Sequence, residues 1–232
     1  MLNDPMLQNH LPPTSPFTPD ALWEYAEKYG KVLLKPSGGG GGAGILQLVP
    51  LGGERYRIHA GKRLLYAEGK EKTVNVLKSL FRPKLYLLQP CLSLGRIGGR
   101  PFDIRVMVQR MDSRHPWKVT GWLAKLAGPG FVVTNIARSR GKVLPLRAAI
   151  RLSNIPASPD LFLNIRRLSL AAARCLGKTY PTLREIGLDL GVDTEGKLWI
   201  IEANFRPALS LFLKLPSRSQ YQKIKAMRLK KA

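Results

Sequence analysis

The sequence predicts an α+β protein with mainly antiparallel sheets, divided into two subdomains. Two successive groups of strand-like segments, each joined by short turns, indicate the antiparallel sheets. Helical periodicity is clearest over residues 158–177. At 232 residues the chain exceeds the usual single domain but falls short of two full ones, so we expect one two-lobed unit.

The first group of elements starts after a proline-rich stretch. Residues 1–19 contain five prolines, which predicts an extended lead-in. A helix is expected over 20–29, with Asp20 as N-cap and Gly30 at its end. Strands are expected at 31–35, 45–49, 55–59 and 63–66, and the apolar spacing of 72–81 predicts a helix. Residues 36–44 must form a turn, because five consecutive glycines cannot hold a regular element.

The second group contains the strands 85–88, 102–110, 118–126 and 132–136, with a turn at 112–116. A helix is expected from Ser158, as N-cap, to Gly177, because apolar residues recur at helical spacing. Segments 188–192 and 198–202 should pair as a hairpin. We therefore expect a lead-in (1–19), a domain (20–210) made of subdomains 20–88 and 89–210, and a basic tail (211–232).

Charge is distributed unevenly along the chain. The 38 Lys and Arg against 15 Asp and Glu give a net charge of +23, which predicts an anionic partner or acidic surroundings. Residues 113–159 contain no acid, and none follows Glu202. No apolar stretch is long enough to span a membrane, and the first residues lack the pattern of a signal peptide, so an intracellular protein is expected. Cys91 and Cys175 are too few for a disulfide framework.

The glycine run is the first candidate binding element. Its backbone N–H groups can approach phosphate oxygens without a Cβ in the way, and Lys35 just before it supplies a compensating charge. The run is not a Walker A loop, because Ile45 rather than Lys-Ser/Thr follows Gly44. A flexible hairpin tip is the alternative interpretation.

A second candidate combines Asp189 with Glu202 and Asn204 on the two strands of the expected hairpin. Alternation places Glu202 and Asn204 on one face, within reach of Asp189, and such oxygen ligands suit Mg²⁺. The apolar run before Glu202 predicts that this carboxylate lies at a buried strand end. The alternatives are an ion pair between Glu202 and Arg206, or an exposed strand edge.

A third candidate is the pair Asp103 and Arg105, which point to the same face of one strand, with Lys125 and Arg138 downstream in the acid-free region. For an isolated Asp-x-Arg, a cross-strand salt bridge in a solvated sheet is the favoured interpretation.

Six motifs in a particular order strengthen the functional interpretation of all three candidate sites. Together, these motifs resemble the YheC/YheD ATP-grasp family. The motifs are KYGKVLLKP with its glycine loop, LLQPCL, RPFDIRVMVQR, WKVTGW, VTN, and EIGLD ending in WIIEANFRP, spanning about residues 11–207. The resemblance implies an ATP-grasp fold of two subdomains enclosing a nucleotide site, with ATP and Mg²⁺ as ligands and an association with the spore coat.

The resemblance also implies roles for individual residues. Lys35 would contact the α- and β-phosphates, under the loop of Gly39, Gly40, Gly41, Gly42 and Gly44. The backbone of Gln89, Pro90 and Cys91 would meet adenine. Arg105 would face the γ-phosphate, oriented by Asp103, with Lys125 also in the catalytic set. Asp189, Glu202 and Asn204 would hold Mg²⁺, and Asn135 and Arg138 would border the acceptor pocket.

The sequence also departs from the family pattern. Such enzymes usually carry a preceding domain and a first nucleotide-binding lysine; Lys28 and Lys31 are the only lysines before Lys35, and neither lies where that lysine is expected. Ser139-Arg140 replaces an expected Gly-Gly pair. Lys125 stands where related ligases have arginine, and lysine cannot make the bidentate contact of arginine.

Three functions therefore remain open. The first is an ATP-dependent carboxylate–amine ligase acting through an acyl phosphate on an unidentified carboxylate and amine. The second is a degenerate ATP-grasp module that serves in the spore coat, with coat proteins or acidic polymers as partners. The third is a polyanion binder; nucleic acid is disfavoured, because Tyr221 alone stands beside the basic residues of the segment 223–231 as an aromatic residue on which bases could stack.

Overall fold

A computed structural model of the protein describes residues 1, 4–38, 42–131, 134 and 140–229. The chain forms two compact units. Unit 1 consists of Met1–Leu11, Ser93–Ala127 and Gly141–Ala232, and unit 2 of Pro12–Leu92 and Gly128–Arg140. Each unit is built on an antiparallel sheet with helices, which confirms the α+β class.

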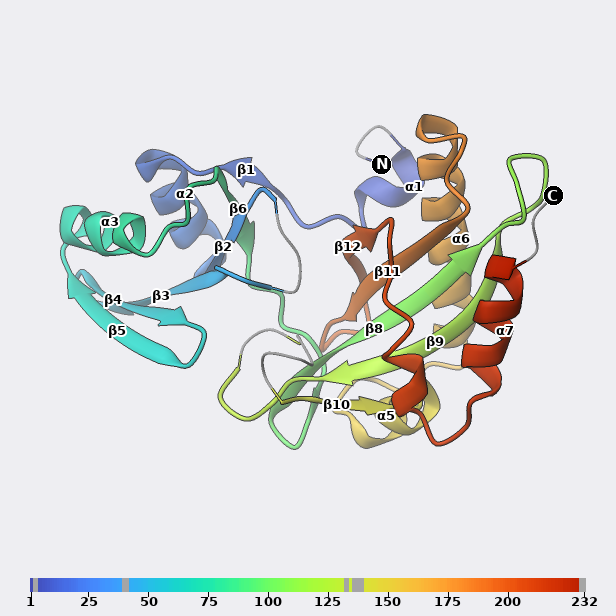
Figure 1. Ribbon diagram of the computed structural model, residues 1–232. Coiled ribbons are helices and arrows are strands. Elements are labelled where there is room, and N and C mark those ends of the chain that lie inside the picture. Colours follow the sequence, from blue (N-terminus) through green and yellow to red (C-terminus); the bar gives the residue numbers. More distant parts are fainter. Residues whose placement is uncertain (2–3, 39–41, 132–133, 135–139, 230–232) are drawn as a thin grey trace. The chain divides into compact units, whose positions relative to one another are not determined.

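Unit 2 contains a sheet in the order β1-β6-β2-β3-β4-β5, with antiparallel pairing throughout. Its strands are β1 (Ser15–Pro16), β2 (Val32–Pro36), β3 (Leu46–Gly52), β4 (Arg55–Ala60), β5 (Arg63–Glu68) and β6 (Tyr86–Pro90). Helices α2 (Pro19–Tyr29) and α3 (Lys70–Ser79) pack on this sheet (Figure 1).

The two faces of this sheet differ, because side chains alternate along each strand. Val32 and Leu34 of β2 point to the face that packs against Leu22 of α2 and Leu77 of α3, and all four are fully buried. Lys35 therefore belongs to the opposite face. The apolar alternation of β2 thus fixes which way its lysine points.

Helix α2 begins one residue earlier than expected and uses a different cap. The Thr18 hydroxyl accepts the Ala21 N–H at 3.1 Å, and Pro19 occupies the first turn. The prediction of Asp20 as N-cap is wrong; Asp20 lies inside the first turn, where its negative charge suits the helix dipole.

Unit 1 contains a sheet in the order β10-β9-β8-β11-β12, with β7 paired to β8. Its strands are β7 (Arg96–Ile97), β8 (Arg100–Gln109), β9 (Lys118–Leu126), β10 (Lys142–Leu144), β11 (Glu185–Val192) and β12 (Leu198–Asn204). β11 and β12 pair directly, which confirms the expected hairpin. The expected strand 132–136 lies outside the described residues except for Thr134.

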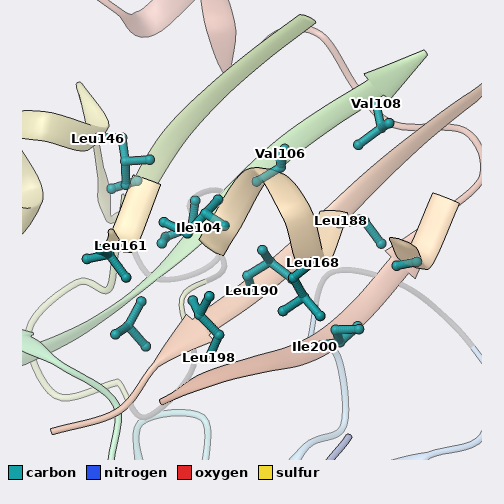
Figure 2. Close-up of a cluster of buried hydrophobic side chains, with 14 of the residues drawn as sticks. Ile104, Val106, Val108, Leu146, Leu161, Leu168, Leu188, Leu190, Leu198 and Ile200 are labelled. Carbon is teal, nitrogen blue, oxygen red and sulfur yellow. The ribbon is translucent and has the colours of Figure 1, made fainter. Parts of the chain in front are cut away.

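One face of this sheet packs on α6 (Leu161–Thr179), with α5 (Leu146–Leu152) beside it. Figure 2 shows aliphatic side chains of β8, β11 and β12 meeting those of the two helices, among them Ile104, Leu168 and Leu190. The expected start of α6 at Ser158 is wrong: Asp160 is the N-cap, and Ser158 only accepts the Leu161 N–H in the preceding turn.

The C-terminal segment covers part of the opposite face. Phe212 of η1 (Phe212–Lys214) and Ile224 of α7 (Ser219–Leu229) are fully buried in a cluster with Met107 and Leu123. Gly121 of β9 allows this approach, since a Cβ there would lie 2.9 Å from both Phe212 and Ile224. The basic tail is therefore a packed part of unit 1 as far as Leu229.

The first residues are also structured. Leu7 of helix α1 (Pro5–Gln8) is fully buried in the core that includes α6, so the expectation of an extended lead-in is wrong here. Asp4 caps α1 by accepting the Met6 N–H at 3.1 Å, and Pro5 occupies the first helical position. None of the helices in the described part of the chain has the length and apolar character of a membrane span.

Candidate functional site

Four charged residues lie together on the face of the unit 1 sheet opposite α6. Lys125 of β9 is the cross-strand partner of Asp103 of β8, and Arg105 of β8 is the partner of Asp189 of β11. Each of these residues is less than a tenth exposed. We call them the ionic cluster. Strand register brings these residues together, because Asp103 and Lys125 are 22 positions apart in the sequence and Arg105 and Asp189 are 84 positions apart.

Asp189 is the centre of the ionic cluster. Its Oδ1 accepts the Arg105 Nε–H at 2.5 Å and its Oδ2 accepts the Nη2–H at 3.0 Å, a bidentate contact. The Lys125 Nζ lies 3.0 Å from the same Oδ2 and 3.1 Å from Asp103 Oδ1. The expected partnership of Asp103 with Arg105 is therefore corrected: Asp103 pairs with Lys125, whereas the hydrogen bonds of Arg105 go to Asp189.

The charges of the cluster stabilise one another against the cost of burial. Burial lowers the pKa of Lys125, but Asp103 and Asp189 raise it by more, so the pKa lies above its ordinary value. Burial likewise lowers the pKa of Arg105, and the hydrogen bonds and charge of Asp189 more than reverse this. For Asp189, burial raises the pKa, while Lys125 and Arg105 bring it below its ordinary value. All three groups are thus held in their charged forms.

Gly187 makes room for a close neighbour on β11. A Cβ at this position would lie 2.6 Å from the Cβ of Pro207, which is too close, and 3.4 Å from the Cδ of Arg105, which is an ordinary van der Waals contact. The packing of Pro207, rather than the Arg105–Asp189 ion pair, therefore requires glycine at this position.

Glu202 is the cross-strand neighbour of Asp189, and Asn204 that of Gly187, so the three expected metal ligands share one face. Glu202 is exposed, however, so the expectation of a buried strand end is wrong. Its negative charge contributes to the raised pKa of Arg105. The apolar run before Glu202 alternates between faces and does not enclose its carboxylate.

The donor set of this face fits Mg²⁺. Glu202 has a carboxylate on this face. Asn204 donates its Nδ2–H to the Gly187 carbonyl at 3.4 Å, so the amide oxygen of Asn204 is on the side of its side chain away from that carbonyl. Asp189 Oδ1 accepts one hydrogen bond, while Oδ2 is contacted by two cations. Mg²⁺ is commonly held by one or two carboxylates together with substrate phosphates. Among the described residues, no group of three or more His, Cys, Asp or Glu is placed to hold a metal ion.

Unit 2 presents a second set of polar residues. Lys35 of β2 donates to Gln89 Oε1 on β6 at 2.5 Å, and Gln89 Nε2 donates to the Thr14 hydroxyl at 2.8 Å. Gln47 and His59 occupy the same face, since Gln47 pairs with both Leu33 and His59. Gln47 and His59 were not among the predicted site residues, although the alternation of side chains along β3 and β4 indicates their shared face.

The described ends of the glycine loop are anchored within unit 2. The Lys84 Nζ donates to the Gly38 carbonyl at 3.0 Å, and the Tyr86 hydroxyl donates to the Gly44 carbonyl at 3.1 Å. Gly44 has φ +79°, and a Cβ there would lie 3.1 Å from the Tyr86 oxygen, so glycine is required. Gly42 also has positive φ. Gly39, Gly40 and Gly41 lie outside the described residues, as do Asn135 and Arg138.

The segment expected to meet adenine ends β6. Gln89 and Pro90 pair with Leu33 and Val32 of β2, and the Cys91 N–H donates to the Lys31 carbonyl at 2.8 Å. This amide extends the β2–β6 ladder in the present conformation. The Cys91 thiol accepts a hydrogen bond from Gln47 Nε2 at 3.0 Å.

Solved protein structures include several with a similar fold. In comparison with solved structures, the chain is similar to the ATP-grasp ligase PsnB complexed with minimal precursor, with a TM-score of 0.55 and 16% identity over 99% of this chain and 58% of that one. A PsnB complex with a phosphomimetic precursor variant, Mg and ADP gives a TM-score of 0.53 and 15% identity, covering 95% of this chain and 53% of that one. The chain therefore has an ATP-grasp fold.

The chain belongs to the family described as YheC/D like ATP-grasp, whose model matches residues 1–232. It is 28% identical over 217 residues to the endospore coat-associated protein YheD of Bacillus subtilis (strain 168), covering 87% of this chain and 46% of YheD. The corresponding YheC of the same organism is 24% identical over 209 residues, covering 88% and 56%. The chain thus spans about half the length of the curated relatives it matches.

Proposed function

We propose that the protein binds Mg-ATP and uses it for ligation of a carboxylate to an amine, in association with the spore coat. The ionic cluster beside Glu202 and Asn204 is the observation that carries this proposal. Phosphoryl transfer depends on positioned cations and metal ligands more than on covalent help from the protein. Membership of the ATP-grasp family is the basis for proposing ATP as the nucleotide, and similarity to YheD is the basis for proposing an association with the spore coat.

The residues of unit 1 act on the phosphates in this proposal. Arg105 and Lys125 supply positive charge to the γ-phosphate, and Asp189 holds the two cations in place until the nucleotide arrives. Glu202, Asn204 and the Oδ1 of Asp189 would hold Mg²⁺, which neutralises phosphate charge when bound. On the basis of the family resemblance alone, Asn135 and Arg138 would border the acceptor pocket.

Residues of unit 2 also have roles in nucleotide binding in this proposal. Lys35 contacts the α- and β-phosphates, and Gln89 fixes the lysine through its neutral amide. The glycine loop follows the phosphates with its N–H groups, and the backbone of residues 89–91 meets adenine. An amide partner suits Lys35 for this role, because it orients the ammonium group without cancelling its charge.

The proposed reaction has two steps. The carboxylate oxygen of the substrate attacks the γ-phosphorus, the bond to the β,γ-bridging oxygen breaks, and ADP leaves. The amine then attacks the acyl carbon, inorganic phosphate leaves with the bonding electron pair, and the amine loses a proton. Arg105 and Lys125 compensate the charge that accumulates in the first step.

A second candidate function is a degenerate ATP-grasp module that serves the coat as a structural component. The ionic cluster itself favours it, because Arg105 and Lys125 are already paired with carboxylates and need no nucleotide for their charges to be stabilised. Mg-dependent ATP binding distinguishes the candidates.

Calorimetric titration with ATP, with and without Mg²⁺, tests the proposal. Wild-type protein should bind saturably and more tightly with Mg²⁺, whereas Lys35→Ala and Glu202→Gln should each weaken binding about tenfold or more. Lys72→Ala on α3 and Glu195→Gln in the β11–β12 turn make the same chemical changes at exposed positions outside the proposed site and should leave affinity unchanged.

Binding should be followed by an assay of ADP release with panels of carboxylates and amines. Saturable binding without turnover on any pair would favour the module without catalysis. Absence of ATP binding to folded protein would contradict the proposal.

A further inference from the structure

A pocket lies on unit 1 beside the part of β9 that no strand covers. β10 pairs only with residues 124–126 of β9, so the edge over 118–122 has no strand partner on that side within the described part of the chain. The pocket has a volume of about 420 Å³ and is lined by residues of β9, α6 and α7. None of these residues belongs to the proposed nucleotide site.

The two helices beside this edge lie on opposite faces of the sheet. α6 packs on the face of Ile104 and Val106, and α7 on the face of Met107 and Leu123 (Figure 1). Arg166 from α6 and Lys223 from α7 both line the pocket. The pocket therefore has a cation on each side of the plane of the sheet.

These two cations have no local counter-charge. Both side chains are exposed, and neither forms an ion pair within the residues that the structure describes. The sequence contains no acid over 161–184 or over 203–232, which includes both helices. An anionic partner fits such a surface.

The β9 edge adds backbone hydrogen bonding to this charge. The Trp122 N–H points out of the sheet edge and donates to the Gln220 side chain at 2.7 Å. A side chain thus occupies the position that a carbonyl of a further strand would take. Thr120 is an extra residue at a register shift between β8 and β9, which bends the edge locally.

We infer that this pocket docks an extended, acidic segment of a partner protein along the free edge of β9, next to Arg166 and Lys223. Side chains of an added strand alternate between the two faces, so adjacent acidic residues of the segment would reach the two cations separately. The segment's carbonyl would replace Gln220 as acceptor for Trp122.

The observations favour a peptide over nucleic acid. Stacking of bases needs exposed aromatic faces. The aromatic residue of the pocket, Trp122, is half-buried and lies against Phe162, with ring centroids 5.8 Å apart, and Arg147 covers Phe162 at 4.7 Å. The pocket therefore offers an edge and charges but no open stacking surface.

Fluorescence anisotropy with two labelled peptides tests this inference without nucleotide. Both are capped Thr/Val peptides with one Asp and one Glu, adjacent in the first and separated by one residue in the second. Adjacent acids reach both faces, whereas separated acids reach the same face. The first should bind about fivefold or more tightly than the second.

Charge reversals provide the matched controls. The double variant Arg166→Glu/Lys223→Glu should weaken binding of the first peptide about tenfold or more. The double variant Arg174→Glu/Lys225→Glu makes the same change on the same helices, at exposed positions outside the pocket lining, and should weaken it much less. Unchanged unfolding midpoints will show that both double variants are folded.

Hydrogen exchange of the β9 amides gives a second measurement. Docking as a strand should protect amides of residues 118–122 when the first peptide is added. Equal binding of both peptides, equal losses in the two double variants, or no binding would overturn the inference. Binding of single-stranded DNA that depends on Arg166 and Lys223 while the peptides do not bind would overturn it in favour of nucleic acid.

Discussion

The two units each place a lysine on a sheet face but surround it differently. In unit 1, Lys125 is 6% exposed and contacts two carboxylates, Asp103 and Asp189. In unit 2, Lys35 is half-buried and donates to the neutral amide of Gln89. Folding therefore surrounds Lys125 with opposite charges, whereas the Gln89 side chain that accepts from Lys35 is uncharged. Removing a charge from the ionic cluster should therefore cost more stability than removing Lys35.

The largest effect is expected for Asp189→Ala. This change leaves Arg105 buried without its bidentate partner and removes one of the two carboxylates next to Lys125, which costs about 3–5 kcal/mol of unfolding free energy. Urea denaturation will measure it. A loss below about 1 kcal/mol would mean that the ionic cluster is solvated and that the contrast between the units is wrong.

Acidic pH should destabilise the protein through the same carboxylate, that of Asp189. The pKa of Asp189 lies below its ordinary value, so its ionisation stabilises the fold fully above the unfolded-state pKa near 4, and this contribution is lost as pH falls through the lower folded-state pKa. The urea midpoint of the wild type should therefore decline below about pH 4. The decline should be shallower in Asp189→Asn; parallel pH profiles would assign the acid sensitivity to other carboxyls.

Gly121→Val tests the second layer of unit 1, which the C-terminal segment provides. The added side chain would collide with Phe212 and Ile224, and we expect a loss of about 1–3 kcal/mol. Hydrogen exchange should show loss of protection in α7 and no change in unit 2. Ile224→Ala removes the same contact from the other side and serves as the comparison variant. Full protection of α7 in Gly121→Val would show that the segment does not depend on this contact.

The smallest effect on stability is expected for Lys35→Met. The half-buried lysine has a neutral partner, so unfolding free energy should change by less than about 1 kcal/mol. ATP affinity should nevertheless fall about tenfold or more, because a phosphate contact is removed. A stability loss as large as that of Asp189→Ala would make Lys35 a structural residue and remove the contrast.

Local patterns in the sequence predicted most elements of the fold. Alternation and turn residues predicted the hairpin of β11 and β12 and the antiparallel sheets, because these features depend on neighbouring residues. Helix starts were less predictable, because several residues near each start can act as caps: Thr18 caps α2 with its side chain, whereas Asp160 precedes α6 without a side-chain capping hydrogen bond. The packing of Leu7 and Ile224 was not predicted, since single apolar residues in polar segments carry little signal.

Local sequence patterns were also insufficient to predict the contacts within the candidate site. The sequence indicated Asp103, Arg105, Lys125 and Asp189, but their pairing follows from the register of three strands, which short-range patterns do not specify. The exposure of Glu202 likewise depends on what covers the sheet face. The assignments of Gly39, Gly40, Gly41, Asn135 and Arg138 stay predictions from resemblance.

Hydrogen exchange with and without Mg-ATP tests whether Lys35, Gln89, Glu202 and Asn204 take part in Mg-ATP binding. The account predicts Mg-dependent protection of β2 and β6, which carry Lys35 and Gln89, and of β12, which carries Glu202 and Asn204, with β5 unchanged as an internal reference. In Glu202→Gln, protection of all three strands should be reduced together. Protection confined to one unit, or none at saturating Mg-ATP, would contradict the account.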